Sequence, residues 1–273
     1  MTTRREALGL FGTAAGAAFL GSLLPDPAAA EQAGGGLTAY GVAPDGKVAG
    51  FPWRYMKLDA DAVAERAYKG FLSGHCMYGS FFGIVGELAE KYGAPYNNFP
   101  FAMMKIGAGG MADWATLCGA LNGSALAASL LSNDPKPIAD DLFNWYQSEP
   151  LPSYHPKQTP RVEITTKSVA HSPLCHASVA RWCEKANVKS FSTERDERCA
   201  WLTASCAKKT VELLNAQADG AFKAAYPVPK EVQECRSCHD KGGELEDTRG
   251  KMDCAPCHFN LGTKHPIIER KKI

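Results

Sequence analysis

The sequence lacks an excess of charge of either sign. Among its 273 residues, 30 are Lys or Arg and 29 are Asp or Glu. Proteins that bind nucleic acids usually carry a clear basic excess, so we expect no nucleic-acid partner. The local basic cluster Arg270–Lys272 stands at the C-terminal end and is typical of a solvated terminus.

Long hydrophobic runs are also missing. The apolar stretch Ala7–Leu24 spans about 18 residues, but glycine dilutes it, so a membrane anchor is the weaker of two interpretations. Arg4 and Arg5 precede this stretch and Ala28–Ala30 follows it, the pattern of a twin-arginine signal with a small-x-small cleavage site. We therefore predict that residues 1–30 are a twin-arginine-type signal peptide, that the chain is periplasmic, and that no stable membrane insertion remains after cleavage.

Strand signals and internal repeats are scarce, which favours a mainly α fold. Arg161–Thr166 has the composition of one short strand. Apolar residues otherwise recur at helical spacing. We expect helices over residues 60–72, 76–92, 111–131, 138–147, 172–186 and 194–218.

Capping and helix-breaking residues define the ends of several of these helices. Asp59 is expected to cap the first helix, Gly74 to end it, and Gly93 to stop the second. A glycine turn over Gly107–Gly110 precedes the third helix, and Thr193 is expected to cap the last one.

The composition divides the chain after the signal peptide into three parts. Residues 31–58 are rich in glycine at their start and are predicted to form a flexible lead-in, and residues 59–225 are predicted to form a helical, cysteine-rich domain. Residues 226–273 are rich in Cys and His and poor in aliphatic side chains, so we predict a short irregular segment there. Such a segment has little core of its own, and a bound cofactor would organise it.

Cysteine, in contrast, is abundant, and four of the ten cysteines lie in two Cys-x-x-Cys-His motifs. Two thiols at this spacing form thioethers to the vinyl groups of one haem, and the adjacent histidine supplies the proximal nitrogen to iron. The sequence therefore predicts two c-type haems per chain and makes residues 226–273 a dihaem segment. The thioether residues are Cys235, Cys238, Cys254 and Cys257, and the proximal ligands are His239 and His258.

Two other interpretations of these motifs are open. Fifteen residues separate the two pairs, so the four cysteines also fit a zinc ribbon. A zinc ribbon has no use for a histidine after each pair, however, and an exported chain passes through the compartment where haem is attached. Two disulfides, each across two intervening residues, would be strained.

Each haem iron has a sixth position, which a distal ligand fills in an electron carrier. His265 is nearest to the motifs in sequence, and His176 stands near the start of a predicted helix beside Cys175. We expect these two histidines to be the distal ligands, with Met252 as an alternative.

Six further cysteines lie in the helical domain: Cys76, Cys118, Cys175, Cys183, Cys199 and Cys206. They fit an Fe–S cluster assembled from several elements, or else three disulfides or buried thiols. The twin-arginine route carries folded proteins, which also points to a second cofactor. Cys199 and Cys206 are about 10 Å apart along one straight helix, so they cannot bind one metal ion together unless that helix bends.

A family resemblance joins these features. The residues that carry it are Cys76, the turn Gly107–Met111, the sequence Cys118-Gly119-Ala120-Leu121-Asn122-Gly123, Cys199 and Cys206. They resemble the redox-active proteins named for a C…GCAxxG…C…C signature, although the central element here reads Cys-Gly-Ala. With the two haem motifs added, the chain from Ala60 to His265 resembles the split-Soret cytochromes c of anaerobic sulfate-reducing bacteria.

The resemblance implies a homodimer with its haems grouped at one end and an axial histidine donated by the other subunit. It also implies an Fe–S cluster in the helical part. The cluster residues would be Cys76, Cys118, Cys199 and Cys206, with Cys175 and Cys183 as further candidates.

The function we predict from the sequence is electron transfer between redox partner proteins by an exported dihaem c-type cytochrome. The alternatives are a haem-dependent reductase of a small molecule and a non-redox zinc-ribbon interaction module. A carrier has six-coordinate, low-spin irons, whereas a reductase has an open iron position.

Overall fold

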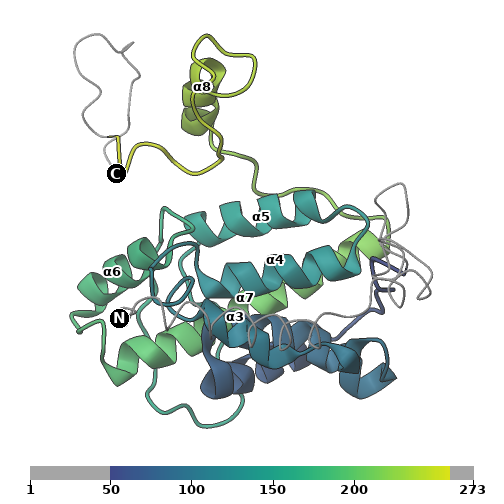
Figure 1. Cartoon of the computed structure of the whole chain (residues 1–273). Coiled ribbons are helices and arrows are strands. Elements are labelled where there is room, and N and C mark those ends of the chain that lie inside the picture. The colour runs from purple at the N-terminus through teal and green to yellow at the C-terminus, as the bar shows by residue number, and fades with distance from the viewer. Residues whose placement is uncertain (1–49, 259–273) are drawn as a thin grey trace, which may run out of the picture. The chain divides into compact units, whose positions relative to one another are not determined.

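The computed structural model describes residues 50–258 and confirms the predicted mainly α class (Figure 1). The α-helices of these residues are α3 (Ala60–Tyr92), α4 (Gly119–Leu131), α5 (Pro135–Ser148), α6 (Cys175–Ala186), α7 (Thr193–Ala218) and α8 (Lys230–His239). Two 3-10 helices, η2 (Tyr96–Asn98) and η3 (Phe101–Gly107), lie between α3 and α4. The predicted signal peptide, most of the lead-in and His265 lie outside the described residues.

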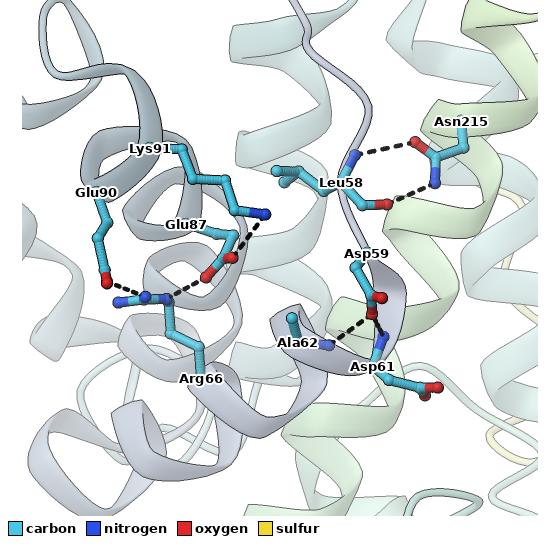
Figure 2. A network of polar contacts seen from close by, with 9 residues as sticks. All are labelled: Leu58, Asp59, Asp61, Ala62, Arg66, Glu87, Glu90, Lys91 and Asn215. Carbon is cyan, nitrogen blue, oxygen red and sulfur yellow. Dashed lines mark hydrogen bonds and ion pairs between the residues drawn. The ribbon is translucent and has the colours of Figure 1, made fainter.

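The N-terminus of α3 is capped as the sequence predicts. The Asp59 carboxylate accepts the backbone N–H groups of Asp61 and Ala62 at 2.8 and 2.9 Å. Further along the helix, Glu87 pairs with both Arg66 and Lys91 (Figure 2). These contacts join two parts of α3 that are separated in sequence.

A break in the middle of α3 matches the two separate helices that the sequence predicts. Gly74 and His75 depart from helical dihedral angles, and His75 has a φ of 64°. The helix restarts at Cys76 and ends at Gly93, which has a φ of 68° and is the predicted stop. Cys76 therefore stands at the N-terminus of a new helical segment.

Three local predictions are wrong. The helix expected from Met111 begins only at Gly119, because Ala112, Asp113 and Ala115 have positive φ angles that an α-helix excludes. The strand expected at 161–166 is absent from the described structure, where this segment has no regular element. The cap of α7 is Ser192, whose Oγ accepts the backbone N–H of Arg195, and not Thr193.

The lead-in is shorter than predicted, because residues 53–58 are bound to the helical domain. The Trp53 N–H donates to the Leu130 carbonyl at 2.8 Å. The Asn215 side chain accepts from the Leu58 N–H and donates to its carbonyl oxygen (Figure 2). These contacts fix the entry of the chain into α3.

The core lies where α3 packs against α7 and α4. Its fully buried side chains include Phe81, Leu88, Leu121 and Leu214, all at most 1% exposed. Burial of such side chains is the main stabilising contribution in a domain of this kind. In the part of the chain that the structure describes, no helix combines the length and the apolar character needed to cross a membrane.

Candidate metal centre and haem-binding segment

Two cysteines that are far apart in sequence lie side by side at the N-termini of two helices. An isolated antiparallel bridge pairs Leu117 with Leu174. On either side of it, the Cys118 N–H donates to the Pro173 carbonyl at 2.9 Å, and the Cys175 N–H donates to the Thr116 carbonyl at 2.7 Å. Cys118 is the N-cap of α4 and Cys175 is the first residue of α6.

A third cysteine, Cys76, reaches the same place because glycine lets α4 approach α3. A Cβ at Gly119 would stand 2.1 Å from the Gly107 carbonyl oxygen and 3.0 Å from the Cβ of Cys76. A Cβ at Gly123 would collide with the Ser80 hydroxyl and the Met77 carbonyl. The two glycines of the Cys118–Gly123 sequence thus place Cys118 next to Cys76.

The fourth cysteine, Cys199, comes from α7. Burial raises the pKa of Cys76 well above its ordinary value, and the nearby thiols of Cys118, Cys199 and Cys175 raise it further. Burial likewise raises the pKa of Cys175 to about 12, with contributions from Cys118 and Cys199. These four thiols therefore lie within electrostatic range of one another.

Two features beside the four thiols oppose the effect of burial and would stabilise metal-bound thiolates. The N-terminus of a helix carries a partial positive charge and unpaired N–H groups, and three helical segments begin at Cys76, Cys118 and Cys175. A protein cation also lies here, because a guanidinium nitrogen of Arg198 is 4.0 Å from the sulfur of Cys199. Such an environment stabilises thiolates that bind metal.

One buried donor beside the thiols, Nε of Arg198, has no hydrogen-bond partner among the described residues. The Tyr146 hydroxyl interacts with Cys118. Burial raises the pKa of Cys118, and the interaction with this hydroxyl lowers it in part. Buried donors without partners are rare in folded proteins and point to a missing acceptor. The residues present thus fit an anionic, thiolate-bound inorganic group.

The spacing of the donors distinguishes between kinds of metal site. In residues 50–258, no three His, Cys, Asp or Glu side chains lie close enough together to hold one metal ion. In an Fe–S cluster the four thiolates are shared among two or more irons, so they need not converge on one ion. The four cysteines therefore suit an Fe–S cluster better than a single ion.

The remaining two cysteines lie at the edges of this group. Burial raises the pKa of Cys206, and among the other thiols Cys118 alone adds to the rise. The pKa of Cys183 is raised by burial and, among the thiols, by Cys199. Since α7 has no break between Cys199 and Cys206, those two thiols stay about 10 Å apart along the axis. All six cysteines of the helical domain are unbridged, so the expected alternative of three disulfides is not realised.

The first haem motif lies on α8, where the sequence analysis expected an irregular segment. Cys235 and Cys238 are one helical turn apart, and His239 is the last residue of the helix. Nδ1 of His239 is 2.7 Å from the carboxylate of Asp247. A carboxylate on Nδ1 fixes the imidazole tautomer in which Nε2 carries the lone pair for a metal. The motif therefore fits a haem.

The second motif forms a single turn at the end of the described residues. The N–H groups of Cys257 and His258 donate to the Cys254 carbonyl at 3.2 and 2.9 Å. Cys238 and Cys257 are exposed, and a covalently held ring would cover them. In the described structure the four motif cysteines form no group that could hold one metal ion.

Contacts with α5 hold the C-terminal segment at two points. The Asp141 carboxylate accepts backbone N–H groups from Ala225 and Tyr226 at 2.5 and 2.8 Å. Lys251, just before the second motif, pairs with Asp140 at 2.5 Å. Neither contact has a local signal in the sequence, since the partners are more than eighty residues apart.

Of the two histidines proposed as distal ligands, one lies within the described residues and one does not. His176 is exposed at the start of α6, and His265 lies outside the described residues. The sequence analysis passed over His171, which is half-buried and has a φ of 50°. Burial and Arg181 lower the pKa of His171, whereas Asp253, which directly precedes Cys254, raises it. His171 thus lies near the second motif.

Comparison with known proteins agrees with this arrangement. Residues 82–213 match the family model described as "Putative redox-active protein (C_GCAxxG_C_C)". Five of the six cysteines of the helical domain lie inside this range, and Cys76 precedes it. The match therefore covers most of the helical domain but begins after Cys76.

Relatives extend the match to nearly the whole chain. The chain is 39% identical over 266 residues to the split-Soret cytochrome c of Desulfovibrio desulfuricans, covering 93% of this chain and 94% of the relative. A solved structure described as a novel iron centre in the split-Soret cytochrome c from the same species has a TM-score of 0.72 and 40% identity, over 76% of this chain and 90% of that chain.

A helical domain with converging cysteines and a segment with two haem-attachment motifs define a redox protein of the c-type cytochrome class. The extent of the match shows that the chain belongs to the split-Soret cytochrome c family.

Proposed function

We propose that the chain is an exported dihaem c-type cytochrome that carries electrons and holds an additional Fe–S cluster. The observation that carries this proposal is the pair of Cys-x-x-Cys-His motifs, the first of them on α8 with Asp247 orienting its histidine. A c-type haem supplies an iron that gains and loses one electron.

Within the haem segment, each residue has a separate role. Cys235, Cys238, Cys254 and Cys257 bind the two rings, and His239 and His258 bind the irons. His265 and His176 remain our proposed distal ligands. The position of His171 near Asp253 makes it a third candidate.

For the cluster, we propose Cys76, Cys118, Cys175 and Cys199 as the ligands. Their mutual proximity, the three helix N-termini and the unpaired Nε of Arg198 support this set. Cys175 takes the place that the sequence analysis gave to Cys206. The novel iron centre described for the Desulfovibrio desulfuricans relative is in keeping with non-haem iron here.

Location and assembly follow from the same proposal. The Arg4-Arg5 pair and the cleavage pattern support export by the twin-arginine route to the periplasm. The family resemblance supports a homodimer that exchanges axial histidines and passes electrons to redox partner proteins.

Iron content is the test. The full chain would be matured with a cytochrome c assembly system and purified without oxygen, and total iron, haem iron and acid-labile sulfide would then be measured. We expect two haem irons per chain, an excess of non-haem iron with sulfide, and low-spin irons that do not bind carbon monoxide. Zinc in place of iron would overturn the cytochrome proposal. Haem iron alone would overturn the cluster, and a high-spin iron that binds carbon monoxide would favour the reductase.

A further inference from the structure

Arg198 on α7 is a buried cation without an anionic protein partner. The residue is 1% exposed. One guanidinium nitrogen donates to the Ser178 hydroxyl at 2.9 Å, and Nε has no partner among the described residues. The Trp182 ring lies beneath the guanidinium, with 5.8 Å between the central carbon and the ring centroid. Neither partner carries a negative charge.

The adjacent carboxylate does not neutralise Arg198. Glu197 is fully buried, but its oxygens are bound by Arg161 at 2.6 Å, Trp201 at 2.9 Å and Tyr68 at 2.5 Å. In the described part of the chain, Arg198 forms no ion pair with any Asp or Glu. A buried charge without a counter-ion is strongly unfavourable, so a protein retains one only where an anion compensates it.

The thiols are the negative groups that Arg198 faces. Its guanidinium contacts the sulfur of Cys199. Since an arginine stays charged at any ordinary pH, this positive charge is a permanent part of the site.

From this arrangement we propose that Arg198 is the counter-ion of the cluster bound by the four cysteines and that it raises the reduction potential of that cluster. The proposal rests on the cluster under "Proposed function". Reduction adds one electron from an external one-electron donor and requires no bond to form or break. Arg198 stabilises the more negative, reduced state more than the oxidised state, because both charges lie in a medium of low dielectric constant.

The effect follows from Coulomb's law, and its direction does not depend on the type of cluster. Each thiolate-bound cluster becomes more negative by one charge on reduction. Removing a cation that contacts a ligand sulfur makes that step less favourable. The haems offer an internal reference, since their motifs lie on α8 and at residues 254–258, outside the cysteine group.

The test is a redox titration of the holoprotein with dithionite and mediators, following the cluster by electron paramagnetic resonance and the haems by absorbance. Arg198→Met keeps an unbranched apolar stem and removes the guanidinium with its charge. At the wild-type midpoint potential, we expect the ratio of reduced to oxidised cluster to fall at least tenfold, which is 59 mV for one electron. Arg198→Lys keeps the charge and is expected to shift the ratio less, and neither variant should move the haem potentials. Lys208→Met removes a cation from the same helix that pairs with Asp61 away from the thiols, and it is the matched control.

Several outcomes decide the proposal. An Arg198→Met cluster that titrates at the wild-type potential overturns it and assigns Arg198 a packing role. If Arg198→Met contains no non-haem iron while Arg198→Lys contains the wild-type amount, the charge is required and the proposal is supported. Loss of iron from both variants would overturn it. Absence of non-haem iron from the wild-type protein would instead refute the cluster itself, so the two failures are distinguishable.

Discussion

The buried carboxylate of Asp141 on α5 accepts the backbone N–H of Tyr226 at 2.8 Å. This bond, together with that from Ala225, ties the start of the haem segment to the helical domain. Lys209 lies 3.7 Å from the other carboxylate oxygen. One residue of α5 therefore contacts both α7 and the C-terminal segment.

Asp141→Ala is expected to lower the free energy of unfolding by about 1–3 kcal/mol, because it leaves two N–H donors and one lysine without their acceptor. Urea unfolding followed by circular dichroism measures this loss. The matched control is Asp140→Ala, whose carboxylate is 42% exposed and pairs only with Lys251 at the surface. Its effect should stay within about 0.5 kcal/mol. Equal losses in both variants would contradict the special role of Asp141.

Gly119→Ala tests the close approach of α4 to α3. A methyl group there would collide with the Gly107 carbonyl, so we expect a loss of about 1–3 kcal/mol in stability and a lower non-haem iron content. Gly250→Ala is the control, since nothing lies within 4 Å of the Cβ position. A Gly119→Ala protein with wild-type stability and iron would show that the packing around Cys76 is looser than described.

The cysteine set can be tested by single substitutions to serine. Cys175→Ser should lower non-haem iron roughly tenfold or more, as expected for the loss of a ligand, and leave the haem content unchanged. Cys183→Ser, on the same helix but affected only by Cys199 among the thiols, should keep the iron. Should Cys206→Ser lose the iron while Cys175→Ser keeps it, the ligand set expected from the sequence alone would be the right one.

The cap of α3 predicts a pH dependence. Hydrogen bonds from the N–H groups of Ala62 and Asp61 hold the pKa of Asp59 below its ordinary value. A carboxylate with a lowered pKa stabilises the folded state above its unfolded pKa, and this contribution is lost as the pH falls through the folded pKa. Asp59→Ala should therefore cost about 1 kcal/mol at pH 7 and progressively less below about pH 4.

The control for the cap is Asp134→Ala. Asp134 is the N-cap of α5, but its side chain makes no capping bond. Urea midpoints measured at pH 7 and pH 3 should show a pH-dependent difference for Asp59→Ala and none for Asp134→Ala. A difference for Asp59→Ala that is the same at both pH values would exclude the carboxylate as its source.

His171 is the candidate distal ligand that the structure adds, and its positive φ is a strained conformation of the kind found at functional sites. His171→Ala should convert one of the two haems to a high-spin form that binds carbon monoxide, as read from absorbance spectra. His155→Ala is the control, because the His155 ring is engaged by the Pro156 carbonyl and by Glu163. Conversion by His176→Ala or His265→Ala instead, with His171→Ala unchanged, would assign the ligand to those residues.

Local signals predicted the parts of the fold that local chemistry determines. The Asp59 cap, the break at Gly74 and the stop at Gly93 depend on neighbouring backbone groups, and the sequence located all three. The late start of α4 could not be predicted in this way, because nothing in Ala112 or Ala115 announces a positive φ. Tertiary contacts with η3 and the Cys175 segment hold those residues in that conformation.

The haem motifs depend on local sequence, whereas the cysteine group depends on tertiary contacts. Thioether attachment requires a fixed short spacing, so Cys235 to His239 could be recognised from five consecutive residues. Cys118 and Cys175 meet only because Leu117 pairs with Leu174, a contact between segments that share no local pattern. The sequence therefore named the six cysteines but not which four of them are neighbours.

The meeting of α3, α4, α6 and α7 at four thiols has a consequence for the order in which the protein matures. Cys76 and Cys199 lie near opposite ends of the helical domain in sequence, so their thiols come together only after most of the domain has folded. An inorganic centre bound there as proposed would close three long loops of chain at once, as disulfides do in many secreted proteins. Iron would then serve this domain as a cross-link as well as a redox group, and a chelator that removed it would act as a denaturant.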